Sequence, residues 1–220
     1  MASPWTAQFH IVNGVAQEKS SSIGIFKNSG PAKRSFLYAI ADGFNTKDPE
    51  PITGEVISNI EAEFKRGGPS VTAALTSAIN ATNGSLLKLN AGRDHDETPR
   101  VGVNCVALTG NELYIAQAGP SLAYIYSDEK IRRVTPSTTK GGVIDIEDAM
   151  GASGNVHINL QRHEMQKGDI VLLASPSLAS LISNDELAII LTAEPDKAIQ
   201  RVFLVAKKEE NFSAVLLTLV

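Results

Sequence analysis

The arrangement of the predicted helices constrains the fold of this chain more than any other feature. Four amphipathic helices are expected, and they occur as two consecutive pairs rather than one after each strand. Apolar residues recur at helical spacing over 54–66 and 69–89 in the first pair, and over 184–191 and 195–207 in the second. A doubly wound parallel sheet needs a helix between successive strands, so the paired helices favour a layered α+β fold with largely antiparallel sheets.

The other regular segments are short, rich in β-forming residues and mostly bounded by Gly, Pro, Asn or Asp. They are predicted as strands over 6–12, 22–27, 35–41, 100–109, 112–118, 121–127, 130–135, 155–164, 170–174 and 213–219. Residues 136–154 are rich in Gly and Ser and are predicted as a loop. Because each helix carries its apolar residues on one face, the first helix pair is expected on one outer side of the sheets and the second pair on the other.

Composition excludes several functional classes. Hydrophobic residues make up 43% and charged residues 20% of the 220 residues, which is typical of folded rather than disordered proteins. The net charge of −4 argues against nucleic-acid binding, which needs a basic face. No apolar run approaches the about 18 residues of a membrane span, and no secretory signal is recognised at the N-terminus. We therefore expect a single cytoplasmic domain over 1–220.

Five segments, in order along the chain, carry a resemblance to a known family. FLYAIADGF at 36–44 contains the tripeptide A-D-G, and Gly54-Glu55 opens a helix after it. NELYIAQAGPSLAYIY at 111–126 is similar to L-x-V-A-N-V-G-D-S-R-A-Y, KGDIVLLASPSLASLIS at 167–183 to G-D-x-L-L-L-C-S-D-G-L, and ENFSAVLLTLV at 210–220 to D-N-x-T-V-V-V. Together they resemble the PPM-type metal-dependent Ser/Thr protein phosphatases, also called type 2C.

The resemblance implies an α-β-β-α sandwich, in which two facing antiparallel sheets lie between helix pairs. It also implies hydrolysis of phosphoserine and phosphothreonine by a water molecule activated between two Mg²⁺ or Mn²⁺ ions. Such hard cations need oxygen ligands, mostly carboxylates, because several negative charges must offset two dications.

Some of the family's ligand positions keep a suitable group. Asp42 stands in the A-D-G tripeptide, and Gly43 still offers its carbonyl oxygen. Glu210 replaces the Asp of the D-N pair and Asn211 follows it; Glu can bind a metal, but its extra methylene displaces the oxygen. Asp42 equally fits a turn at a strand end, and Glu210 a solvated loop, so these alternatives stay open.

Other family positions have lost the groups that the chemistry requires. Pro176 replaces the Asp of S-D-G, and proline has no side-chain oxygen. Residues 14–22 stand where the family has R-x-x-N-E-D; they hold no Arg and no Asp, and Glu18 and Ser22 mark the degenerate positions. Pro120 replaces the Asp of G-D-S. The sequence therefore predicts a phosphatase fold with a dismantled metal site.

Two functions remain, and both use the same region. A shallow polar cleft at the strand ends is predicted to be formed by Asp42, Gly43, Ser175, Ser177 and Glu210. The first function is that of a pseudophosphatase, a binding or regulatory module for another protein in signalling, such as a phosphoprotein or a kinase-pathway component. It needs no cofactor, and loops 44–53 and 136–154 are its expected contact regions.

The second function is that of a divergent but active Mg²⁺- or Mn²⁺-dependent phosphatase for phosphoserine and phosphothreonine. It would use Asp42, Glu210 and substitute ligands. The number of lost carboxylates favours the pseudophosphatase.

Overall fold

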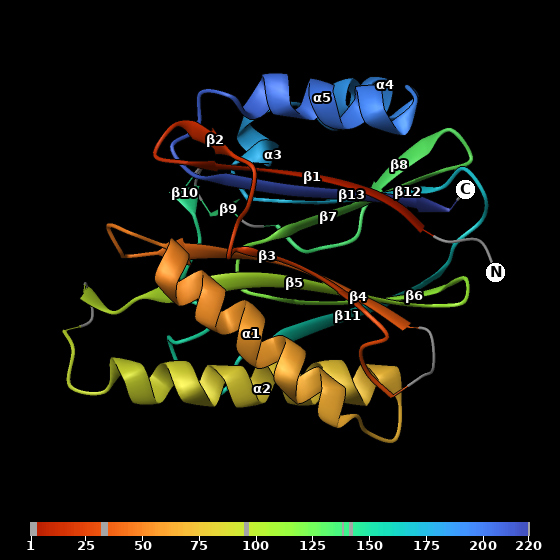
Figure 1. Ribbon diagram of the computed structural model, residues 1–220. Coiled ribbons are helices and arrows are strands. Elements are labelled where there is room, and N and C mark those ends of the chain that lie inside the picture. Colours follow the sequence, from red (N-terminus) through yellow and green to blue (C-terminus); the bar gives the residue numbers. More distant parts are fainter. Residues whose placement is uncertain (1–3, 32–34, 95–96, 138, 141–142, 220) are drawn as a thin grey trace.

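The computed structural model describes residues 4–31, 35–94, 97–137, 139–140 and 143–219. These residues form four layers, with two sheets packed face to face and helices on both outer sides (Figure 1). All strand pairs described are antiparallel. The α-β-β-α sandwich and its mainly antiparallel sheets are thus confirmed.

Each of the two sheets is named here after one of its inner strands. The β13 sheet contains, in spatial order, β2 (Val15–Gln17), β1 (Pro4–Val12), β13 (Phe212–Leu219), β12 (Ile170–Ala174), β7 (Leu122–Ser127) and β8 (Lys130–Arg133). The β4 sheet contains β11 (Ile158–Glu164), β6 (Glu112–Ala118), β5 (Arg100–Thr109), β4 (Ser35–Phe44) and β3 (Ile23–Lys27). A separate small hairpin pairs β9 (Thr139–Lys140) with β10 (Val143–Ile144).

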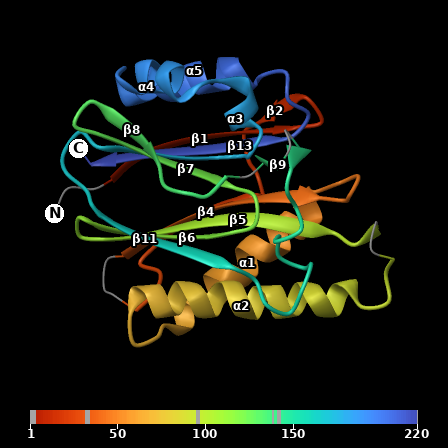
Figure 2. The same ribbon diagram turned by 180° about the vertical axis from the view of Figure 1, so that it is seen from behind.

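The helices cover the sheets in the predicted pairs. Helices α1 (Glu50–Arg66) and α2 (Val71–Asn90) lie on the β4 sheet, and α4 (Asn184–Leu191) and α5 (Pro195–Ala206) lie on the β13 sheet with the short α3 (Leu178–Leu181) beside them (Figure 2). At the start of α4, Ser183 and Glu186 form the reciprocal hydrogen bonds of a capping box, as their spacing predicts. No helix in the described ranges is long and apolar enough to span a membrane.

Apolar side chains fill all three spaces between the four layers. Successive residues of a strand point to opposite faces, so each inner strand serves two of these clusters. In β4, for example, Leu37, Ala39 and Ala41 face α1 and α2, whereas Tyr38 and Ile40 face the other sheet. By the same alternation, the side chains that follow along β4 also point in turn to the helices and to the other sheet.

The structure corrects several predicted boundaries. Helix α1 begins at Glu50 instead of residue 54, because Pro51 is tolerated in a first turn whose N–H groups have no helical partner. The strand predicted from residue 155 begins at Ile158. The predicted loop 136–154 contains β9 and β10, while residues 138, 141 and 142 lie outside the described part of the chain. Strand β2 and helix α3 are too short to show a period, and both are missing from the prediction.

Candidate functional site

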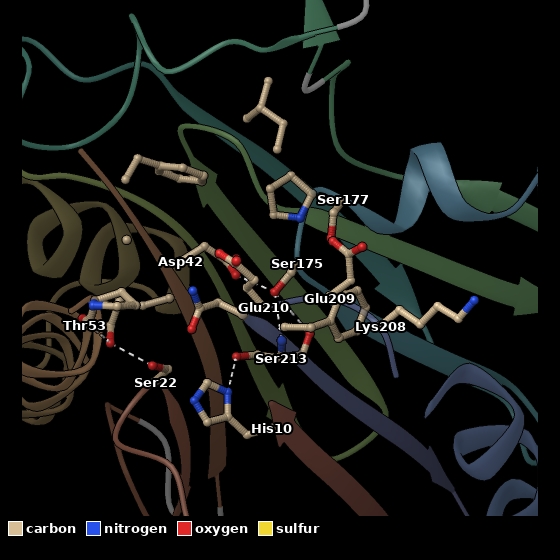
Figure 3. A pocket seen from close by; sticks show the side chains of 18 residues that line it. His10, Ser22, Asp42, Thr53, Ser175, Ser177, Lys208, Glu209, Glu210 and Ser213 are labelled. Carbon is tan, nitrogen blue, oxygen red and sulfur yellow. Dashed lines mark hydrogen bonds between the residues drawn. The ribbon is translucent and has the colours of Figure 1, made fainter. Parts of the chain in front are cut away.

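A pocket of about 410 Å³ opens at one end of the sandwich, where β4 and β12 end and β13 begins (Figure 3). It brings together all five residues of the predicted polar cleft. The described residues that line it are His10, Ser22, Ala41, Asp42, Gly43, Phe44, Pro49, Thr53, Ile144, Ser175, Pro176, Ser177, Lys208, Glu209, Glu210, Asn211, Phe212 and Ser213.

The polar character of the pocket follows from the strand alternation. On β12, Val171 and Leu173 belong to the apolar cluster between the sheets, and Ser175 is the next residue on that face. On β13, Val215 and Leu217 belong to the same cluster, and Ser213 precedes them by one repeat. Asp42 follows Ile40 in β4 in the same way. The inner faces of both sheets therefore change from apolar to polar at the same end of the sandwich.

Asp42 is held by hydrogen bonds that cross from one sheet to the other. The Ser175 hydroxyl donates to Oδ1 of Asp42, and the Ser175 Oγ accepts from the backbone N–H of Ser213 at 2.8 Å. Oδ2 of Asp42 is buried and makes no hydrogen bond with the described residues. Burial raises the pKa of Asp42 to about 7, and the hydrogen bond from Ser175 opposes this rise. Near neutral pH, both the neutral and the charged form of the Asp42 carboxyl are therefore populated.

His10 lies on β1, directly opposite Ser213 on β13, and lines the pocket. Its Nδ1 is 2.8 Å from Oγ of Ser213, and its Nε2 is 3.5 Å from Oε1 of Glu50. Burial lowers the pKa of His10, although the Glu50 carboxylate opposes this shift. The imidazole is therefore mainly neutral at pH 7.

Hydroxyl groups occupy the side of the pocket next to α1. The hydroxyls of Ser22 and Thr53 are 2.6 Å apart, and the Thr53 hydroxyl donates to the carbonyl oxygen of Pro49 at 2.9 Å. Ser22 stands in the segment where the family has R-x-x-N-E-D, and here it supplies a hydroxyl that is hydrogen-bonded to Thr53. It contributes no carboxylate.

The other predicted positions are placed differently. Glu210 and Asn211 lie at the pocket, and the carbonyl oxygen of Glu210 accepts from the N–H of Gly14 at 2.9 Å. Glu18 is exposed and is absent from the described lining residues, so the structure does not bring it to Asp42. Pro120 lines a smaller, separate pocket, and its carbonyl oxygen faces Gly102. Pro176 lines the main pocket, where it supplies no side-chain oxygen.

Sequence reasoning named none of His10, Thr53, Lys208 and Glu209 as pocket residues, although Thr53 lies in the predicted contact loop 44–53. The pairing of His10 with Ser213 joins positions at opposite ends of the chain, and no local pattern reports it. The other three flank predicted positions or a helix start. A signal for Glu209 and Lys208 was available, because they adjoin Glu210 in the sequence.

These residues do not fit a two-ion metal centre. Within the described ranges, no group of three or more His, Cys, Asp or Glu is placed to hold a metal ion. Asp42 has one oxygen, Oδ1, hydrogen-bonded to Ser175, which leaves Oδ2 as its unbonded oxygen. Two neighbouring dications need several ionised carboxylates to offset their repulsion, and this donor set supplies too few.

Comparison with solved structures gives clear matches in fold. A serine/threonine phosphatase from S. agalactiae superposes with a TM-score of 0.79 at 16% identity, covering 99% of this chain and 100% of its own. The Mycobacterium tuberculosis serine/threonine phosphatase PstP superposes at 0.75 with 20% identity, covering 98% of both chains. A Staphylococcus aureus serine/threonine phosphatase superposes at 0.76 with 17% identity, covering 100% of this chain and 95% of its own.

No protein-family model matches the sequence, and no curated protein matches it. At such low identities the structural likeness establishes the fold and leaves the activity open. The chain has the fold of the PPM-type Ser/Thr phosphatases, as its five sequence segments predict. The catalytic domain of PstP has been solved in complex with two manganese ions, which is a property of that protein.

Proposed function

We propose that this chain is a pseudophosphatase, a PPM-like domain that binds or regulates another protein instead of hydrolysing phosphate esters. The observation that carries the proposal is Pro176. It lines the pocket at the position where the resemblance places an aspartate, and it has no side-chain oxygen to offer a metal. Asp42 remains, with Oδ1 hydrogen-bonded to Ser175, and it is left without the aspartate that would share a metal ion with it.

The charge around the pocket supports the same conclusion. Of the described lining residues, Asp42, Glu209 and Glu210 are acidic, and no arginine stands among them. Lys208 is basic, but its side chain extends away from Asp42 (Figure 3). A phosphoryl dianion entering this pocket would meet carboxylates without the cations that normally neutralise it, so the pocket disfavours the family's substrate.

The divergent phosphatase stays a second candidate because Asp42, Glu209 and Glu210 line one pocket. Two measurements separate the candidates. Calorimetric titration with Mn²⁺ is expected to give no saturable heat below millimolar concentrations, and p-nitrophenyl phosphate and phosphothreonine peptides are expected to remain intact with or without Mn²⁺. Turnover that Asp42→Asn abolishes and Glu129→Gln retains would establish the divergent phosphatase instead; Glu129 is exposed in the β7–β8 turn.

The proposal includes a setting as well. We expect a single domain over 1–220, located in the cytoplasm, that contacts a phosphoprotein or a component of a kinase pathway. The contact surface is expected at the pocket and its flanking loops, because these present varied side chains on a rigid sandwich.

A further inference from the structure

We propose that the pocket binds a cationic side chain, a lysine ammonium or arginine guanidinium, presented by an otherwise apolar segment of a partner protein. This inference rests on the proposed function and specifies its ligand. It reverses the charge preference of a phosphate site, because the described lining residues include three acidic side chains, Asp42, Glu209 and Glu210, against one basic side chain, Lys208.

The acceptors come from both sides of the pocket. Asp42 reaches it from β4, and Glu209 reaches it from the α5–β13 connection on the other side (Figure 3). Glu210 adds an exposed carboxylate at the mouth. A positively charged nitrogen between such groups would be attracted from several directions at once, whereas an anion would be repelled from the same directions.

Two buried oxygen atoms at the pocket lack hydrogen-bond partners among the described residues. They are Oδ2 of Asp42 and Oγ of Ser177. Buried polar atoms are normally hydrogen-bonded, so two unpaired atoms at one pocket indicate a group that pairs with them on binding. An ammonium carries three N–H donors and a guanidinium five, and neither carries an acceptor, so both complement this set.

A single charge also suits the site better than a divalent metal ion. A metal ion needs several ionised carboxylates in close coordination, and the described residues offer no such group. An ammonium or guanidinium is satisfied by one or two carboxylates together with neutral hydroxyl oxygens. Ser177 supplies such a hydroxyl next to the acidic residues.

Three exposed apolar residues lie close in sequence to residues at the pocket. Val15 follows Gly14, which is hydrogen-bonded to Glu210, and Val143 precedes Ile144, which lines the pocket. Leu181 is the last residue of α3, four residues after Ser177. Both ribbon views place β2, α3 and the β9–β10 hairpin at this end of the sandwich (Figures 1 and 2). A lysine or arginine with apolar neighbours would insert its charge into the pocket and place its neighbours near these exposed apolar residues.

The test uses displayed libraries of nonapeptides with randomised flanks and a fixed central lysine, arginine, norleucine or phosphoserine. The intact protein is expected to enrich peptides with central lysine or arginine and apolar flanks. For the peptide bound most tightly, replacing the central residue by norleucine is expected to weaken binding at least tenfold. Asp42→Asn should weaken it about tenfold, and the exposed Glu210→Gln about threefold, while Glu129→Gln leaves it unchanged.

The outcomes separate this inference from the function on which it rests. Three results would overturn the cationic ligand. They are equal enrichment of norleucine peptides, no enrichment of any peptide, and binding affinities that neither Asp42→Asn nor Glu210→Gln changes. Capture of phosphoserine peptides without release of phosphate would overturn it too, but would leave the pseudophosphatase standing. Release of phosphate from those peptides would overturn the pseudophosphatase itself.

Discussion

The hydroxyl of Ser175 donates a hydrogen bond to Oδ1 of Asp42 and so joins the ends of two strands in opposite sheets. The same Oγ accepts from the N–H of Ser213 at 2.8 Å, which extends the connection to a third strand. The other carboxylate oxygen of Asp42, Oδ2, makes no hydrogen bond with the described residues. Oδ1 takes part in a hydrogen-bond network that holds the two sheets together at the pocket.

The raised pKa of Asp42 predicts a pH-dependent stability. The pKa of Asp42 is about 7 in the folded state against an ordinary value of 3.8, so the folded protein binds more protons than the unfolded chain between these pH values. The free energy of unfolding should therefore fall as the pH rises from about 4 to about 7, by about 2–4 kcal/mol. Urea denaturation of the wild type and Asp42→Asn at pH 5 and pH 8 measures this.

The expected result is that the wild type loses stability relative to Asp42→Asn between the two pH values. The difference isolates Asp42 from other groups around the pocket, which include His10 on β1, the acidic residues Glu209 and Glu210, Lys208 beside them, and Glu50 on α1. A difference that stays constant with pH would show that the carboxyl keeps an ordinary pKa.

Removal of the Ser175 hydroxyl is predicted to destabilise the fold. Ser175→Ala would leave Oδ1 of Asp42 and the N–H of Ser213 without this partner inside the protein, at a cost of about 1–3 kcal/mol. It should also raise the pKa of Asp42 further, because that hydrogen bond favours the charged form. Ser180→Ala is the matched control, since the Ser180 hydroxyl is exposed and bonds only locally to the Ser177 carbonyl. Equal losses in the two variants would contradict the prediction.

The fold is largely predictable from sequence because its signals are local. Amphipathic helices and alternating strands report their buried faces residue by residue, and paired helices exclude alternating βαβ units. The predicted start of α1 at residue 54 was wrong because the prediction followed the apolar spacing, while the first turn from Glu50 contains Pro51, which a first turn accepts. Strands β9 and β10 have two residues each, which is too short for any period.

The site is predictable only where motifs mark it. The resemblance brought Asp42, Ser175 and Glu210 together, and the structure places all three at one pocket. It also marked Glu18, which the structure leaves outside. His10 was unpredictable, because its place at the pocket depends on the pairing of the first and last described strands.

Two glycine substitutions should change stability in opposite directions. A Cβ on Gly102 would lie 2.1 Å from the carbonyl oxygen of Pro120, a backbone atom that cannot move aside freely. Gly102→Ala should therefore cost about 2 kcal/mol or more, as overpacked core sites do. Gly84 lies within α2 with no atom within 4 Å of such a Cβ, so Gly84→Ala should add about 0.5–1 kcal/mol. Thermal melts of both variants decide this, and a stabilised Gly102→Ala would contradict the packing at Pro120.

Restoring carboxylates should restore affinity for metal, if their loss is what dismantled the site. Pro176→Asp combined with Glu210→Asp would add one acidic side chain beside Asp42 and shorten another at the same pocket. Because a ligand stabilises the state that it binds, Mn²⁺ at about a hundredfold above its Kd would add roughly 2.7 kcal/mol to the free energy of unfolding. The double variant should therefore melt at a higher temperature as the Mn²⁺ concentration rises, whereas the wild type should not.

The control variant is Pro176→Asn with Glu210→Gln, which places neutral amides at both positions and leaves Asp42 and Glu209 as the acidic residues of the pocket; it should resemble the wild type. A shift of similar size in this neutral pair would show that charge is not the missing element, and a shift in the wild type would show that the pocket already binds the metal.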